Sequence, residues 1–152
     1  FKYSIYFNMV YLLVMKKTIF FLFIILFMNT ASFSDNHYQP QKKLFFISPN
    51  NGDEVTSPVA VKFGIEGMKI VPAGINEPMS GHHHLLVNIN KLPNMKMPIP
   101  SDENHLHFGK GQTETVLELP KGKHTLQLLL GDYLHIPHDV PILSEKIEII
   151  VK

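Results

Sequence analysis

The sequence predicts an all-β protein, an antiparallel β-sandwich of about seven short strands that is preceded by a signal peptide. After the first 34 residues, apolar and polar residues alternate over short stretches, as they do in half-buried strands. Clusters of Gly, Pro, Asn and Asp separate these stretches at fairly regular spacing. No stretch has the 3.6-residue period of an amphipathic helix. Together these observations favour two packed sheets.

Residues 15–34 have the three parts of an export signal. Two lysines follow Met15, an apolar run covers 18–28, and the small residues Ser32 and Ser34 come next. The run of about 11 residues is shorter than the ~20 that a membrane-spanning helix needs. We therefore expect cleavage near Ser34 and a periplasmic or secreted product. An uncleaved membrane anchor is the alternative.

The rest of the chain is divided by composition. Residues 1–14 begin with Phe1 and are interpreted as an upstream mis-start or an extra apolar segment, 35–42 as a polar lead-in, and 43–152 as the β-sandwich domain. Cleavage would remove three of the 14 basic residues and none of the 13 acids, which leaves 11 − 13 = −2. The chain has no arginine, which argues against a nucleic-acid partner. It has no cysteine, so neither disulfides nor lipid attachment at a signal-peptide cysteine is available.

The first strands are expected at 44–47, 59–65 and 83–89. A turn at 48–53 ends the first, and the second has alternating apolar residues from Val59 to Ile65. Residues 67–81 and 92–104 are rich in Pro or Gly and are predicted to be loops. Loops as long as 92–104 are often functional in compact domains.

The last strands are expected at 115–119, 124–130 and 142–151. A Pro-Lys-Gly-Lys turn at 120–123 separates the first two, and Leu126, Leu128 and Leu130 are in phase. Residues 131–141 form the last predicted loop, and the closing strand has Ile147 and Ile149 in phase.

Seven of the nine histidines fall into three groups, which predicts a metal site. Imidazole is the commonest protein ligand for transition metals. Strand alternation places His82 and His84 on one face and His83 on the other. The Cα atoms of His82 and His84 would lie about 6.6 Å apart, close enough for both rings to bind one ion. The predicted ligands are His82, His84, His105, His107, His135 and His138, with His83, Met95, Met97 and Asp132 as weaker candidates.

Each group also has a purely structural interpretation. His82 and His84 would then be exposed on the solvent face of a sheet, and His83 would be a packed, hydrogen-bonded residue at the edge of the core. The histidines at 105, 107, 135 and 138 would satisfy loop backbone. His124 shares the phase of Leu126 and is interpreted as structural.

The methionines shift the expected metal towards copper. Met95 and Met97 precede His105 across a proline-rich loop, and Met79 precedes His82. Thioethers favour Cu(I), while imidazole suits copper, zinc, iron and nickel. We therefore expect copper in preference to zinc. The alternative is that the methionines fill gaps in the core.

Five motifs in this order resemble a known family. They are Pro-Ala-Gly at 72–74, Gly-His-His-His-Leu-Leu-Val at 81–87, His-Leu-His-Phe-Gly-Lys-Gly-Gln-Thr-Glu at 105–114, Gly-Lys-His-Thr-Leu-Gln-Leu at 122–128, and Gly-Asp-x-x-His-x-Pro-His at 131–138. The set is similar to the bacterial family called domain of unknown function 4399, over residues 57–151. The resemblance implies an exported protein with an immunoglobulin-like sandwich. It implies no activity.

Three functions follow from these features. The first is an exported protein that binds copper or zinc for buffering, carriage or sensing. The second is a metal-free immunoglobulin-like module that binds an unidentified envelope protein. The third is a metal-dependent hydrolase or oxidase with Glu114 as base, disfavoured because no catalytic-nucleophile or zinc-protease motif occurs. A nucleotide site is excluded, because Gly109-Lys-Gly111 lacks the phosphate-loop pattern.

Overall fold

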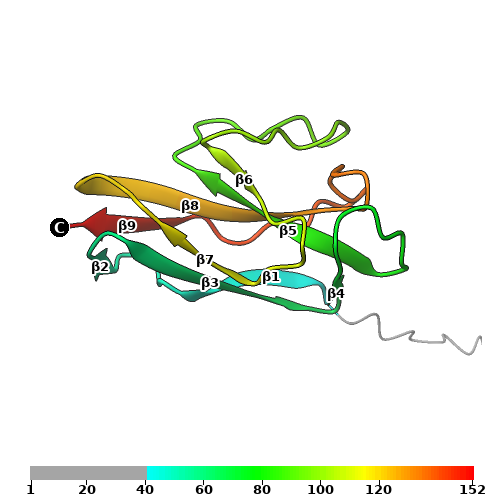
Figure 1. Cartoon of the computed structure of the whole chain (residues 1–152), viewed down its shortest axis with the longest axis horizontal. Helices are drawn as coiled ribbons and strands as arrows, with labels where there is room; N and C mark the ends of the chain where they lie inside the picture. The colour runs from blue at the N-terminus through cyan, green and yellow to red at the C-terminus, as the bar shows by residue number, and fades with distance from the viewer. Residues whose placement is uncertain (1–40) are drawn as a thin grey trace, which may run out of the picture. The chain divides into compact units, whose positions relative to one another are not determined.

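Residues 41–152 form two stacked β-sheets in the computed structural model, and no helix occurs among them (Figure 1). The predicted signal peptide and the residues before it lie outside the described residues, as does the lead-in up to residue 40. Within 41–152 there is accordingly no helix long and apolar enough to cross a membrane. The all-β class with two sheets is confirmed for the part of the chain that the structure describes.

The smaller sheet has three strands and the larger sheet has six. The smaller has the order β1 (Lys43–Ser48), β3 (Val59–Glu66) and β7 (Glu114–Leu117), all antiparallel. The larger has the order β2 (Glu54–Val55), β9 (Ile147–Val151), β8 (Gly122–Gly131), β5 (Ser80–Val87) and β4 (Lys69–Ile70), and β6 (His105–His107) also pairs with β5. β2 is parallel to β9 and β4 is parallel to β5. Figure 1 shows β1, β3 and β7 as a layer beneath β5, β8 and β9.

The strand count and several boundaries differ from the prediction. β5 begins at Ser80 and ends at Val87, where a strand at 83–89 was expected. Nine strands are present in the described residues where about seven were expected, because β2 and β4 have two residues each and are too short to show periodicity. β4 lies inside the expected loop 67–81. The closing strand begins at Ile147, since residues 142 and 144 instead hydrogen-bond to the backbone of β8. The immunoglobulin-like connectivity stays a prediction.

The main core lies between the sheets and follows the alternation of the sequence. In β3, Val59, Val61 and Phe63 are buried while Ala60 and Lys62 are exposed. The larger sheet contributes apolar residues from β5, β8 and β9: Leu85, Val87, Leu126, Leu128, Leu130, Ile147, Ile149 and Val151. Burial of these aliphatic side chains, at roughly 1.5–3 kcal/mol each, is the main stabilising contribution to the sandwich.

A second, smaller core covers the opposite face of the larger sheet. Leu86 of β5 and Leu129 of β8 point away from the smaller sheet and pack against Ile99 from the loop between β5 and β6. Partly buried Met95 and Leu143 complete this group. Because both faces of β5 are covered, all eight of its residues are buried. Polar side chains on its outward face are therefore removed from water.

Candidate metal centre

Four imidazole rings meet on the outward face of the larger sheet. His82 and His84 come from β5, His107 from β6, and His135 from the loop after β8. The ring centroids of His82 lie 4.8 Å from His84, 5.0 Å from His107 and 4.9 Å from His135, and His107 lies 4.7 Å from His135. We call these four residues the histidine cluster.

The sheet register explains three of the four positions. Alternation along β5 turns His82 and His84 to the same side, and β6 pairs with β5 so that His107 stands directly opposite His84. The centroids of those two rings are 5.1 Å apart. On the other side of β5, His82 stands opposite Gly131 of β8. Two paired strands, β5 and β6, therefore place three of the four rings.

His135 reaches the cluster through a tight loop that Asp132 organises. The Oδ1 atom of Asp132 accepts hydrogen bonds from the backbone N–H groups of Leu134 and Ile136, both at 2.8 Å. His135 itself has φ 67°, which is uncommon for a residue other than glycine. Its carbonyl accepts a bond from the N–H of Ile99, at 2.8 Å, in the loop that covers β5. Strained backbone of this kind is often found at functional sites.

Two glycines leave the space that two of the rings occupy. A Cβ atom on Gly131 would lie 2.7 Å from Cε1 of His84, and one on Gly109 would lie 2.6 Å from Nε2 of His107. Neither glycine has a positive φ, so the need for glycine here is steric and not conformational. Neither glycine was predicted to be part of the metal site. Their signal was their position, since Gly109 follows His107 by two and Gly131 precedes His135 by four.

Two rings of the cluster are fully buried and two are half-buried, and most of the ring nitrogens of His82, His84 and His107 lack hydrogen-bond partners. His82 and His84 are 0 % exposed, and both nitrogens of each ring are buried without a partner, as is Nε2 of His107. Buried polar groups in folded proteins are nearly always paired, because an unpaired one costs about 1–3 kcal/mol. Five such atoms in one place could be satisfied together by one metal ion.

The electrostatics favour neutral imidazoles. The pKa of His82 is lowered to about 4 and that of His84 to about 3, mainly by burial and in part by the neighbouring rings. Burial and the nearby His135 also hold the pKa of His107 below its ordinary value. The neutral ring is the form that binds a metal ion, so these nitrogens are available as ligands at neutral pH.

The separation of the nitrogens is close to that of a metal site. One nitrogen from each of His82, His107 and His135 lies within 4.8 Å of the others. Ligands on opposite sides of one ion, with bonds of ~2.0–2.1 Å, stand up to about 4.2 Å apart. Modest rotations of the side chains would therefore bring the three nitrogens onto one ion. His84 contacts all three rings and is placed to supply a fourth ligand.

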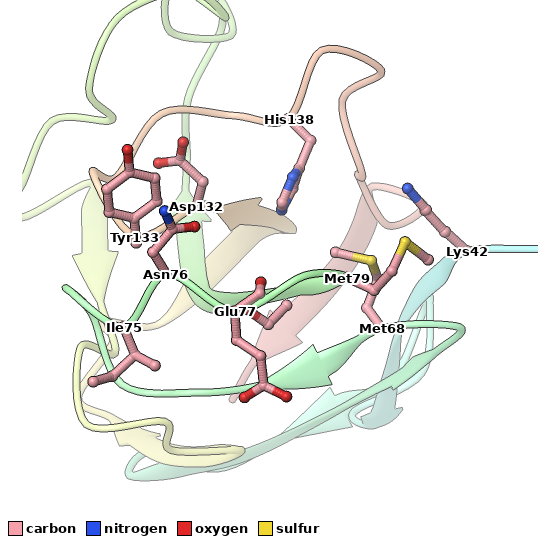
Figure 2. A pocket seen from close by; sticks show the side chains of 10 residues that line it. Lys42, Met68, Ile75, Asn76, Glu77, Met79, Asp132, Tyr133 and His138 are labelled. Atoms are coloured by element: carbon pink, nitrogen blue, oxygen red, sulfur yellow. The ribbon is translucent and has the colours of Figure 1, made fainter.

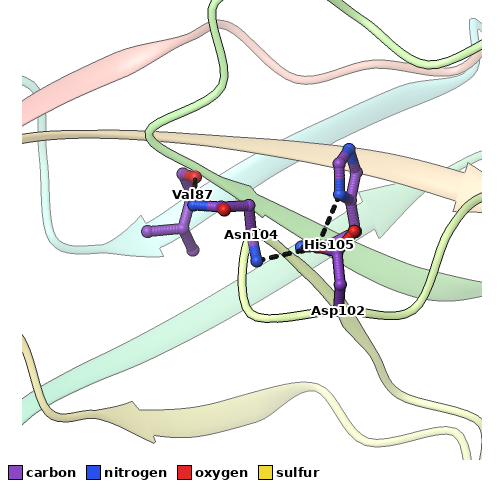
Figure 3. A network of polar contacts seen from close by, with 4 residues as sticks. All are labelled: Val87, Asp102, Asn104 and His105. Carbon is purple, nitrogen blue, oxygen red and sulfur yellow. Dashed lines mark hydrogen bonds and ion pairs between the residues drawn. The ribbon is translucent and has the colours of Figure 1, made fainter.

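Two other predicted ligands lie elsewhere among the described residues. Nδ1 of His105 donates a hydrogen bond of 2.8 Å to Asp102, and its ring makes none of the contacts that join the cluster. His138 lines a separate cavity with Asp132 (Figure 2). Figure 3 shows the group at Asp102, where the carboxylate also accepts the backbone N–H groups of Asn104 and His105.

The weaker candidates have structural roles in most cases. His83 is buried on the opposite face of β5, where its ring packs 4.9 Å from that of Phe63 and its Nδ1 donates to the carbonyl of Gln112. Met95 fills part of the second core. Met97 is 56 % exposed. Asp132 holds the loop of His135, which makes it an outer residue that positions a ligand.

His124 and Glu114 both lie outside the histidine cluster. His124 donates from Nε2 to the carbonyl of Pro120, and its Nδ1 accepts from Asn88, as expected of a structural residue. Glu114, the base of the enzymatic alternative, lies in the smaller sheet and pairs with Lys62 at 3.4 Å. It is therefore not part of the cluster. The solvent-exposed alternative for His82 and His84 is wrong, because loops cover that face.

The comparison with known families agrees with the resemblance drawn from the five motifs. The family described as domain of unknown function (DUF4399) matches residues 61–152, which is more than half of the chain and includes all four members of the histidine cluster. No match was found among curated proteins or among solved structures. The chain belongs to the DUF4399 family.

Proposed function

We propose that this protein binds one transition-metal ion through His82, His84, His107 and His135. The observation that carries the proposal is the convergence of four rings, two of them fully buried, in which five buried ring nitrogens of His82, His84 and His107 lack hydrogen-bond partners. A hydrogen-bonded polar network would satisfy these atoms with side chains or backbone, and none does so here. A cation that accepts several nitrogen lone pairs satisfies them together.

Copper is the ion that the ligand set favours. The cluster offers neutral nitrogen ligands, and the chain has no cysteine to supply the thiolates common in structural zinc sites. For a given set of nitrogen ligands, divalent copper binds more tightly than divalent zinc. In an exported protein, as residues 15–34 predict, such a site would serve buffering, carriage or sensing of copper.

Titration of the metal-free, untagged chain with Cu(II) and Zn(II) tests the proposal. We expect one tightly bound Cu(II) ion per chain and weaker binding of Zn(II). The bound Cu(II) should give a ligand-field spectrum typical of nitrogen donors. The His82→Leu/His84→Leu variant should lose the tight Cu(II) site, because it removes two of the four ligands. Isothermal titration in the presence of a competing chelator measures both affinities.

A matched control is His105→Leu. His105 lies two residues from His107 on the same strand but bonds to Asp102 and not to the cluster. This variant should keep tight Cu(II) binding. Equal loss in both variants, or a wild-type chain without a stoichiometric site, would contradict the proposal.

A further inference from the structure

A second group of metal-binding side chains lines a cavity of about 260 Å³ beside the histidine cluster (Figure 2). Met68, Met79 and His138 are among its lining residues. Figure 2 shows the side chains of both methionines and the ring of His138 at this cavity. The cluster histidines 82, 84 and 107 do not line it.

The parallel pairing of β4 with β5 explains why the methionines are neighbours. Lys69 is the partner of Ser80, so Met68 and Met79 enter the two strands side by side, and the N–H of Lys69 donates to the carbonyl of Met79 at 2.8 Å. Met79 has φ 56° and is 43 % exposed. A methionine that merely fills a core gap would be buried in relaxed backbone, and Met79 is neither.

His138 provides an independent observation. Its Nε2 atom is buried and has no hydrogen-bond partner. Burial lowers the pKa of this ring, while Asp132 acts in the opposite direction. The neutral nitrogen therefore faces a cavity in which two thioethers are the other soft donors.

The chemistry of this donor set selects a soft, monovalent cation. Thioethers are soft ligands that favour Cu(I) over hard cations. Lys42 also lines the cavity, and its positive charge disfavours a divalent ion more than a monovalent one. Asp132 lines the same cavity and supplies a compensating negative charge.

We propose that Met68, Met79 and His138 form a second site, which binds Cu(I) through two sulfurs and one nitrogen. The site is separate from the histidine cluster, and it would remain if the cluster failed to bind metal. The two sites share chain segments, because Met79 precedes His82 by three residues and His138 follows His135 by three.

NMR of the methionine methyl groups with Ag(I), a redox-stable probe for Cu(I), tests this site. In the full, metal-free chain we expect two methyl signals to shift and to saturate at one equivalent of Ag(I). Met68→Leu and Met79→Leu should each remove one of them, since leucine has nearly the same volume and keeps the packing. Competition with a chromophoric Cu(I) chelator should show the affinity of this site falling by more than about 10–100-fold in the double variant.

The control variants separate the two sites. Met97→Leu removes an exposed methionine and should change neither the shifts nor the affinity. His82→Leu/His84→Leu should abolish the Cu(II) site and leave both methyl shifts. The inference is overturned if the Met68→Leu/Met79→Leu variant binds as much Ag(I) and Cu(I) as the wild type, or if other methionine signals shift instead.

Discussion

His82 and His84 illustrate a conflict between stability and binding at single residues. Without metal, each ring holds two buried nitrogens that make no hydrogen bond. Replacement by an apolar side chain of similar size removes that cost, whereas replacement of a hydrogen-bonded residue leaves its partners unpaired. The two histidines are therefore expected to weaken the metal-free fold that carries them.

We predict that His82→Leu/His84→Leu is at least as stable as the wild type when both are free of metal. The gain should reach about 1–3 kcal/mol, the usual cost of an unpaired buried polar group. Urea unfolding under chelating conditions measures it. His124→Leu is the control and should destabilise by a similar amount, because it leaves Asn88 and the carbonyl of Pro120 without their partner. A large loss of stability in the double variant would show that these rings have partners in solution.

Substitution of Gly131 tests whether copper affinity depends on the position of the His84 ring. In Gly131→Ala the added Cβ would lie 2.7 Å from Cε1 and 3.1 Å from Nδ1 of His84, so this ring must move. We predict a loss of copper affinity of about 10–100-fold, as for other changes that misplace a ligand. Chelator competition measures the affinity.

A steric control for this variant exists in the other sheet. A Cβ on Gly64 would lie 2.6 Å from the Phe45 ring, so Gly64→Ala introduces a similar overlap far from the histidines in the fold. It should lower stability and leave copper affinity unchanged. If both glycine variants bind copper as the wild type does, then His84 is not a ligand.

At the level of elements, the 131–138 loop depends on one carboxylate. Asp132→Ala removes the acceptor for two backbone N–H groups and should release His135 from its left-handed conformation. Asp132→Asn keeps an acceptor oxygen and loses only the charge. We predict a loss of copper affinity of about 10–100-fold for alanine and a much smaller loss for asparagine. The same titration compares them, and equal losses would mean that charge, and not the loop, is what matters.

Strand alternation predicted most of the cluster, and loop geometry accounts for what it could not predict. Alternation correctly separated His83 from His82 and His84, and it correctly turned His107 towards the site. Alternation also predicted His105 as a ligand, and this ring lies outside the cluster. The cause is its hydrogen bond to Asp102, which no periodicity in the sequence reveals. His135 and His138 looked equivalent in sequence. Their separation follows from the positive φ of His135, which depends on the Asp132 turn and the contact with Ile99.

The short strands were missed for a related reason. β2 and β4 have two residues each and are both held by parallel pairing, β2 with β9 and β4 with β5. Period-2 alternation needs at least four residues to be visible. The second core was also not foreseen, because the prolines of 92–104 mark a loop without showing that Ile99 returns to cover the sheet.

At the level of the whole molecule, burial of the histidines makes the metal-free fold sensitive to acid. The folded pKa is about 4 for His82 and His83 and about 3 for His84, against 6.5 in the unfolded chain. Between these values the unfolded chain binds more protons, so the free energy of unfolding falls as pH falls. The contribution of these three neutral rings to the free energy of unfolding is therefore fully present above about pH 6.5 and is lost progressively as the pH falls towards 4. Each ring contributes up to about 1.4 kcal/mol per pH unit.

We predict that the metal-free protein loses several kcal/mol of stability between about pH 6.5 and pH 5. Urea unfolding across this range measures the slope, and His82→Leu/His84→Leu should reduce it markedly, since this variant removes two of the three rings whose pKa is lowered to about 4 or below. Saturating Cu(II) should raise the stability of the wild type at neutral pH by about 2.7 kcal/mol at a hundredfold excess over Kd. A flat profile from pH 6.5 to 5 would contradict the burial of these rings.

The histidines lie outside the sandwich interior, beneath loop segments, and this location governs how fast a bound ion would come and go. The rings are covered by the Ile99 loop and by the 131–138 turn, while the aliphatic layer between the sheets lies on the far side of β5. Local opening of a cover requires far less free energy than separating two sheets. The time for which an ion would stay bound at this site would thus depend on local opening of these two loops, and an ion would be able to leave while the two sheets stay packed.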